Sequence, residues 1–190
     1  MFWVGGYGPD MNGTGTGIGR MVSRADGSLE YTGVVVETPS PSYLAQGSGH
    51  IYSVDEGRGT VSSFVASGDG LVADGTVESS GRWPCHVAFL GDALVVANYF
   101  TGTLATIGLA PDGAMSGPLQ TLSSPARDGH AHSSVLAAPG LLVSADLGAD
   151  RLLLHSIADG AVTRTGEGGM PAGTGPRDLV IHESGLLYVL

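Results

Sequence analysis

The fold can be read from one stretch of the sequence, residues 130–152, which runs HAHSSVLAAPGLLVSADLGADRL. Two histidines, His130 and His132, open a short apolar run. After a Pro-Gly break, a second run covers Leu141 to Ser144 and leads into an Asp-Leu-Gly turn, and a third run extends from Leu152 to Ile157. Short apolar runs separated by Gly, Pro and Asp are typical of β-strands. The stretch therefore predicts a series of consecutive strands.

The same spacing occurs elsewhere in the chain, which makes this stretch one unit of a repeat. Three pairs of residues are each 14 positions apart: Pro41 and Asp55, Pro84 and Asn98, and His132 and Asp146. Each unit then reaches a turn, at Asp69-Gly70, Asp112-Gly113 or Asp159-Gly160. Pro176 opens a further copy. The starts of the units are therefore 43, 48 and 44 residues apart.

A repeat of this length with four short strands predicts an all-β fold, a β-propeller of four-stranded blades. A β-sandwich would also supply many short strands, but it would not keep a fixed register. The Gly-His and Trp-Asp pairs of WD40 repeats do not recur in each unit. We predict a single, partial propeller domain over residues 1–190. Its blade-like units are predicted at 1–40, 41–83, 84–131 and 132–175, with the start of another at 176–190.

The first unit differs from the others, because it is expected to contain three strands, at residues 2–7, 18–23 and 29–37. An Asp26-Gly27 turn joins the last two, as in a hairpin. The chain is then predicted to hold 17 strands, a little over four blades, in an incomplete ring. An open ring exposes a sheet face. We expect the N-terminal part of a longer protein or, as the alternative, a ring that two chains close by self-association through the open edge.

Composition excludes several classes of function. The net charge of −10 argues against binding to nucleic acid or anionic membranes. The sequence has no lysine, which excludes Schiff-base chemistry and a Walker lysine. The one cysteine, Cys85, cannot form a disulfide within the chain. No signal peptide and no long apolar run is seen. We therefore expect a cytoplasmic protein without a cofactor, and with no nucleic-acid or membrane partner.

Several motifs, taken together and in this order, resemble those of one known family. They are Phe2-Trp3-Val4-Gly5, Glu37 to Leu44 (ETPSPSYL), Pro84-Cys85-His86-Val87, Ala97-Asn98-Tyr99, His130-Ala131-His132-Ser133, Asp146 to Arg151 (DLGADR) and Gly175-Pro176-Arg177. The chain resembles the lactonase family of seven-bladed propellers, which includes bacterial propeller-type 6-phosphogluconolactonases and fungal carboxymuconate cycloisomerase relatives. A member of that family would have about seven units, so this chain would hold roughly the first four.

The resemblance also implies which residues form the site. The family uses a histidine of the His-Ala-His segment and an arginine of the Pro-Arg motif, which correspond to His132 and Arg177. It further uses an acidic residue after the next strand and a later arginine, and both would fall beyond Leu190. We interpret His132 and Arg177 as catalytic residues. His86 stands at the third position of its unit, near the same rim of the channel, and we interpret His86 and His130 as substrate-binding residues.

The chemistry of these residue types agrees with that interpretation. A neutral imidazole can take a proton from water, and a guanidinium can bind an anion or a developing oxyanion. His130 and His132 are two apart and would share a strand face, but no third metal ligand is evident, so no metal is expected. Cys85 is expected to be a small buried residue. Asp55, Asn98 and Asp146 recur at one register, which favours a structural role at turns.

The predicted activity is hydrolysis of a sugar-acid lactone, such as 6-phosphogluconolactone, in carbohydrate metabolism. The expected partner is a small-molecule lactone or an anionic sugar acid. Two alternatives stay open at this point. One is a cycloisomerase acting on a muconate-type diacid, and the other is a non-catalytic propeller that serves as a binding module or is an inactive fragment.

Overall fold

The computed structural model describes residues 1–158 and 161–190, and the predicted turn at Asp159-Gly160 lies outside the described residues. Within them the chain forms 17 strands in five antiparallel sheets, together with two short 3-10 helices, Pro9–Met11 and Leu147–Ala149. The first sheet contains β1 (Phe2–Val4), β2 (Gly17–Ser23) and β3 (Leu29–Glu37). The second contains β4 (Pro41–Gly47), β5 (His50–Asp55), β6 (Thr60–Ser67) and β7 (Gly70–Glu78).

The remaining sheets follow in chain order. The third contains β8 (Pro84–Phe89), β9 (Ala93–Asn98), β10 (Thr103–Leu109) and β11 (Met115–Ser123). The fourth contains β12 (Ala131–Ala138), β13 (Leu141–Asp146), β14 (Arg151–Ala158) and β15 (Ala161–Gly169). A final hairpin pairs β16 (Leu179–Ile181) with β17 (Leu187–Val189). No helix in the described chain is long and apolar enough to cross a membrane.

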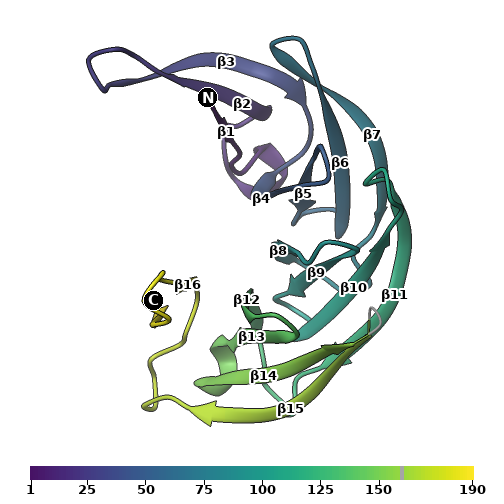
Figure 1. The fold of residues 1–190 in the computed structure, drawn as a ribbon, viewed down its shortest axis with the longest axis vertical. Coiled ribbons are helices and arrows are strands. Elements are labelled where there is room, and N and C mark those ends of the chain that lie inside the picture. Colours follow the sequence, from purple (N-terminus) through teal and green to yellow (C-terminus); the bar gives the residue numbers. More distant parts are fainter. Residues whose placement is uncertain (159–160) are drawn as a thin grey trace.

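The sheets are arranged as blades in an open arc (Figure 1). The innermost strands β4, β8, β12 and β16 contact one another in series, and the outermost strands β3, β7 and β11 form a second series. This is the predicted all-β propeller arrangement, and the ring is not closed. In the first sheet the order is β1-β2-β3 with β3 outermost, so this blade has the three strands that the sequence predicted and lacks an innermost one.

The hydrophobic core lies between the blades. Leu94 and Val96 of β9 pack toward the second sheet, in a cluster with Tyr52, whereas Val95 and Ala97 pack toward the fourth. Successive side chains of a strand point to opposite faces, so both faces of β9 are covered and all six of its residues are buried. Because each blade buries its faces only against its neighbours, the blades depend on one another for stability.

The first strand is shorter than expected, since β1 ends at Val4 and not at residue 7. Gly5 explains this difference. A Cβ atom at Gly5 would lie 2.0 Å from the carbonyl oxygen of Pro41. The chain therefore leaves the sheet here and passes directly over the start of β4, a close approach that only glycine permits.

The fourth unit was predicted to start at His132, in register with Pro41 and Pro84, and this prediction is wrong by one residue. Pro41 pairs with Asp55 and Pro84 with Asn98, but the partner of Asp146 is Ala131, not His132. The β12–β13 hairpin contains a second irregularity, between Leu136 and Ala138. It explains why Ala131 and its partner Asp146 are one position further apart in the sequence than the two equivalent pairs. The fourth inner strand accordingly begins one residue before the predicted unit start, and His132 is the counterpart of the residues that follow Pro41 and Pro84.

Candidate active site

The corrected register explains how side chains reach the centre of the arc. Ser42, Cys85 and His132 are each the extra residue of a β-bulge, skipped between two paired positions at the start of an inner strand. A bulge interrupts the ladder and re-aims a side chain, and bulges are frequent beside active sites. All three residues line one cavity of about 450 Å³. The bulges therefore direct one side chain from each blade into a shared space.

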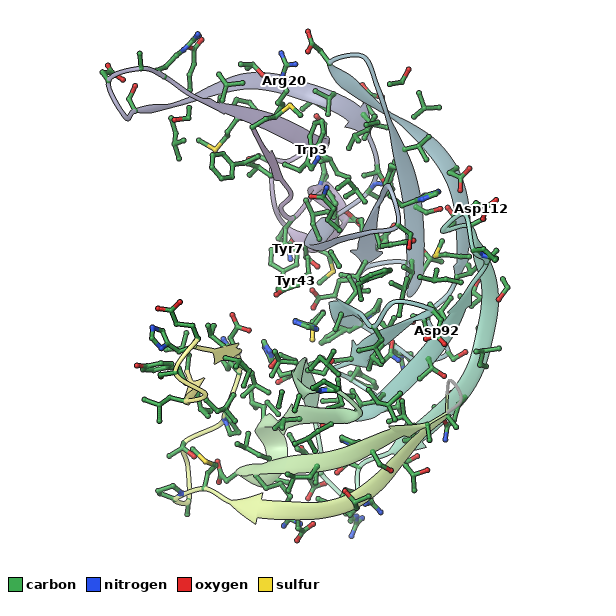
Figure 2. All side chains as sticks on the ribbon, viewed as in Figure 1. Trp3, Tyr7, Arg20, Tyr43, Asp92 and Asp112 are labelled. Atoms are coloured by element: carbon green, nitrogen blue, oxygen red, sulfur yellow. The ribbon has the colours of Figure 1, made fainter. Side chains whose placement is uncertain are left out.

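The other cavity residues come from all parts of the chain, from Tyr7 near one end to Asp178 near the other. The complete lining consists of Tyr7, Ser42, Tyr43, Glu56, Trp83, Cys85, His86, Tyr99, His132, Ser133, Arg177 and Asp178. Figure 2 shows Tyr7 and Tyr43 on the inner side of the arc. Of the predicted site residues, the structure brings His132, Arg177 and His86 to this cavity and does not bring His130 to it.

Arg177 lies two residues before β16 and follows Pro176 directly, as Ser42 follows Pro41 and Cys85 follows Pro84. The N–H groups of Arg177 and Asp178 both donate to the carbonyl oxygen of Leu190, at 2.6 and 3.4 Å. The loop before it is held by Asp150, whose carboxylate accepts hydrogen bonds from the N–H groups of Gly173 and Gly175, each at 2.7 Å. Arg177 forms no ion pair within residues 1–158 and 161–190. Its guanidinium is therefore available to an anion.

His132 lies beside Arg177. Burial is the main cause that lowers the pKa of His132, and the positive charge of Arg177 lowers it further, while a hydrogen bond with the Arg177 backbone acts in the opposite direction. The ring of Tyr99 meets the His132 ring edge to face, with 5.9 Å between centroids. At neutral pH the His132 imidazole is thus uncharged, which is the form that can accept a proton.

His86 is a second neutral imidazole in the cavity wall. It is 6% exposed, and burial lowers its pKa to about 4. Its Nδ1 atom is buried without a hydrogen-bond partner among the described residues. Its ring lies 4.2 Å from that of Tyr43, measured between centroids. His86 contributes shape and a polar edge to the cavity, and no positive charge at neutral pH.

His130 has a different environment from His132. It precedes β12, so the two histidines do not share a strand face as predicted. Its ring stacks on Tyr99 at 4.5 Å, and its Nδ1 lies 2.9 Å from the carbonyl oxygen of Tyr99. Its backbone N–H donates to Asp146 at 2.8 Å. These contacts place His130 behind Tyr99, which itself lines the cavity.

Cys85 occupies a bulge position but is held as a thiol. Its Sγ atom lies 3.3 Å from the carbonyl oxygen of His132 and 3.7 Å from those of Ala97 and Ala131. Burial is the main cause that raises its pKa to about 12. A thiol in this state is a poor nucleophile. Cys85 was predicted to be buried, but it is only partly buried and lines the cavity.

Asp55, Asn98 and Asp146, the residues that recur at one register, are structural as predicted. All three are buried. Asp55 accepts a hydrogen bond from the N–H of Arg58, and the Asn98 amide donates to the carbonyl oxygen of Ser79. Asp146 accepts hydrogen bonds from the backbone N–H of His130 and from the hydroxyl of Ser124. For Asn98 and Asp146, these contacts attach the segment before an inner strand to its own blade.

The sequence did not predict the acidic and aromatic parts of the cavity. Glu56 is bound by the hydroxyls of Tyr7 and Ser42, and Trp83 stands at the rim with a positive φ of 56°. A non-glycine residue in this region is strained and is often found at functional sites. Of the cavity residues that the sequence analysis missed, only Ser42 could have been found from the repeat, because it follows Pro41 as Cys85 follows Pro84. The others come together from different blades.

Among the described residues, no group of three or more His, Cys, Asp or Glu side chains is placed to hold a metal ion. The polar chemistry of the cavity therefore has to be argued from His132, Arg177 and the carboxylates. Together these side chains can bind a small polar ligand, accept a proton and balance a negative charge.

Comparison with known proteins agrees with this geometry. The model of one family, described as "Lactonase, 7-bladed beta-propeller", matches residues 1–190. The chain belongs to the lactonase family of seven-bladed β-propellers. This membership confirms the resemblance found in the sequence, including the propeller fold.

Individual members of the family are similar over most of this chain. The chain is 24% identical over 160 residues to the 6-phosphogluconolactonase of Bacillus subtilis, an alignment that covers 75% of this chain and 46% of that relative. The solved periplasmic gluconolactonase of Pseudomonas aeruginosa is 27% identical, with a TM-score of 0.81, covering 98% of this chain and 60% of that one. A Bacteroides uniformis structure, provisionally named a 6-phosphogluconolactonase, is 25% identical with a TM-score of 0.88, at 98% and 60% coverage. The chain thus spans about half the length of the curated relatives it matches.

Proposed function

We propose that this protein hydrolyses a sugar-acid lactone of the 6-phosphogluconolactone type, with His132 as general base and Arg177 as anion binder. One observation supports this most directly. His132, at the start of β12, and Arg177, just before β16, present an uncharged imidazole and a guanidinium without an ion-pair partner among the described residues to the same cavity. The names of the similar proteins from Bacillus subtilis and Pseudomonas aeruginosa, a 6-phosphogluconolactonase and a gluconolactonase, agree with the proposal.

The reaction requires a water molecule and no other co-reactant. His132 accepts a proton from water as the water oxygen attacks the lactone carbonyl carbon. The carbonyl oxygen becomes negatively charged, and the Arg177 guanidinium stabilises it. When the tetrahedral intermediate collapses, the ring C–O bond breaks and His132 returns the proton to the leaving oxygen. The product is the open-chain sugar acid, and both protein groups return to their starting states.

Replacement of His132 tests the proposal. We expect His132→Ala to lower kcat for glucono-1,5-lactone and its 6-phosphate by about 10²–10³-fold, as is usual for loss of a general base. His182→Gln, which removes an exposed histidine of the last hairpin, is the control. Because the His132 pKa is lowered and the neutral form is the active one, the acid limb of kcat/KM should lie below pH 6.5. Lactone turnover that survives in His132→Ala would contradict the proposal.

We also propose that the reaction belongs to carbohydrate metabolism in the cytoplasm. Cys85, the one cysteine of the sequence, is a free thiol, which agrees with a reducing compartment. The similar protein from Pseudomonas aeruginosa is periplasmic, so fractionation of cells, with detection of this chain, tests the location. Recovery of the chain outside the cytoplasmic fraction would contradict this part of the proposal.

A further inference from the structure

Glu56 is a buried carboxylate for which the proposed reaction has no use. It is 7% exposed, lines the cavity, and pairs with no arginine in the part of the chain that the structure describes. Burying a carboxylate without a cation is unfavourable. Residues of this kind in a cleft are functional-site candidates. The position of Glu56 therefore requires an explanation that involves the cavity.

The two oxygens of this carboxylate differ. Oε2 accepts hydrogen bonds from the Tyr7 hydroxyl at 2.9 Å and from the Ser42 hydroxyl at 3.3 Å. Oε1 accepts no hydrogen bond from the described residues. Tyr7 follows β1 and Ser42 lies on β4, so two blades hold Oε2 and thereby set the orientation of the whole group. The carboxylate is fixed through one oxygen, and its other oxygen remains for a ligand.

An ionised carboxylate only accepts hydrogen bonds. It therefore favours ligands that carry hydroxyl donors, and it repels a ligand carboxylate or phosphate brought close to it. Arg177 supplies the opposite charge and lines the same cavity. Burial is the main cause that raises the pKa of both Tyr7 and Cys85; the charge of Glu56 raises these pKa values further, and the charge of Arg177 lowers them. A ligand lying across this cavity meets an acceptor at one wall and an anion binder at another.

We propose that Glu56 binds the hydroxyl groups of a polyhydroxylated ligand and orients it so that its carbonyl end faces Arg177. This rests on the proposed lactone hydrolysis and names its substrate class: sugar lactones are preferred over lactones without hydroxyls and over dicarboxylates. Tyr7 and Ser42 act as positioning residues, since they fix the carboxylate. The muconate-type diacid considered above would place a carboxylate against Glu56 or Asp178, which disfavours it.

Binding of a ligand that cannot be hydrolysed tests the proposal apart from catalysis. We use 1,5-anhydro-D-glucitol, which has a sugar ring with hydroxyls and no lactone, and tetrahydropyran, the same ring without hydroxyls. Saturation-transfer NMR or calorimetry should detect the first and not the second. Glu56→Gln should weaken binding of anhydroglucitol about 10-fold, because a charge-assisted hydrogen bond is lost. Glu78→Gln, which changes an exposed glutamate at the end of β7, is the matched control.

A second variant separates a ligand-binding role from a structural one. Glu56→Met keeps the shape and removes both acceptors, and replacing a buried charge by an apolar group is often neutral or stabilising. We expect the Tm to stay the same or rise while anhydroglucitol binding is lost. A lowered Tm with binding retained would show that Glu56 only supports the fold. Equal binding of anhydroglucitol by Glu56→Gln and the unaltered protein, or no binding by the unaltered protein, would also overturn the proposal.

Kinetics distinguish failure of this inference from failure of the proposed function. With glucono-1,5-lactone as substrate, Glu56→Gln should raise KM about 10-fold, while kcat/KM for δ-valerolactone, which has the same reactive group and no hydroxyls, should change less than about 2-fold. Loss of both activities to the same degree would overturn the specificity role and leave lactone hydrolysis in place. If the unaltered protein turns over neither lactone, the proposed function fails, and the binding experiment still decides the role of Glu56.

Discussion

Two sets of equivalent positions in the blades have opposite characters. Successive blades carry Ser42, Cys85 and His132 at the bulge that begins each inner strand, and Arg177 follows Pro176 as Ser42 follows Pro41 and Cys85 follows Pro84. We call these four positions the bulge set. At the end of the second strand, the blades carry Asp55, Asn98 and Asp146. The bulge positions hold four different chemical groups, whereas the strand-end positions hold nearly the same one. The repeat varies at the cavity and is uniform where the chain must turn.

The physical reason lies in what each position must satisfy. The strand-end residues are buried beside backbone N–H and carbonyl groups that need partners. A buried backbone group without a partner costs free energy in every blade alike. The bulge residues face a cavity and have no cross-strand partner. Their identity is therefore free to differ between blades, and the chemistry of the site can be built from them.

The largest effect among the predictions should come from the bulge set. Arg177→Ala should lower kcat for glucono-1,5-lactone by about 10²-fold, because the developing oxyanion loses its cation. Arg177→Lys should recover part of the loss, since lysine supplies charge without the planar fork. The free energy of unfolding should hardly change, as Arg177 forms no described ion pair. Steady-state kinetics of the variants measure this.

The control for Arg177 is Arg127→Ala, an exposed arginine away from the cavity lining. It should retain normal kcat. Equal activity of Arg177→Ala and Arg127→Ala would contradict the claim that the bulge set carries the chemistry of the site.

The strand-end set should show the reverse behaviour. Asp146→Ala leaves the His130 N–H and the Ser124 hydroxyl without their buried acceptor, so we expect the free energy of unfolding to fall by about 3 kcal/mol. Turnover per folded molecule should change much less than in Arg177→Ala. Urea unfolding measures the loss, and Asp92→Ala, at an exposed aspartate, provides the matched control. An Asp146→Ala protein with full stability and little activity would reverse our assignment of roles.

The smallest effect should come from Cys85, the bulge residue without assigned chemistry. Because its pKa is raised to about 12, almost no thiolate exists at pH 8, and DTNB should modify the folded protein more than about 100-fold more slowly than the unfolded chain. Cys85→Ser should retain kcat within about 2-fold. Rapid labelling together with loss of activity would show that every bulge residue takes part in the chemistry, and would sharpen the contrast with the strand-end set.

The sequence by itself determined the strands, the repeat and the family. β2, β3, β13 and β14 follow from short apolar runs between turn residues, because alternation and turn chemistry are local properties. His132 and Arg177 were also within reach of the sequence, since each lies in a short motif of the family that the chain resembles. His86 was placed at the same rim from its position in its unit, and the structure brings all three to one cavity.

Tertiary structure alone decided the details of the site. The bulges shift His132 by one register position, and stacking on Tyr99 places His130 outside the cavity lining. The contact between Tyr7 and Glu56 joins residues 49 positions apart, in different blades. No local pattern predicts such a contact, because it depends on how one blade packs against the next. The sequence therefore determines each blade, and the packing of the blades determines which side chains meet at the centre.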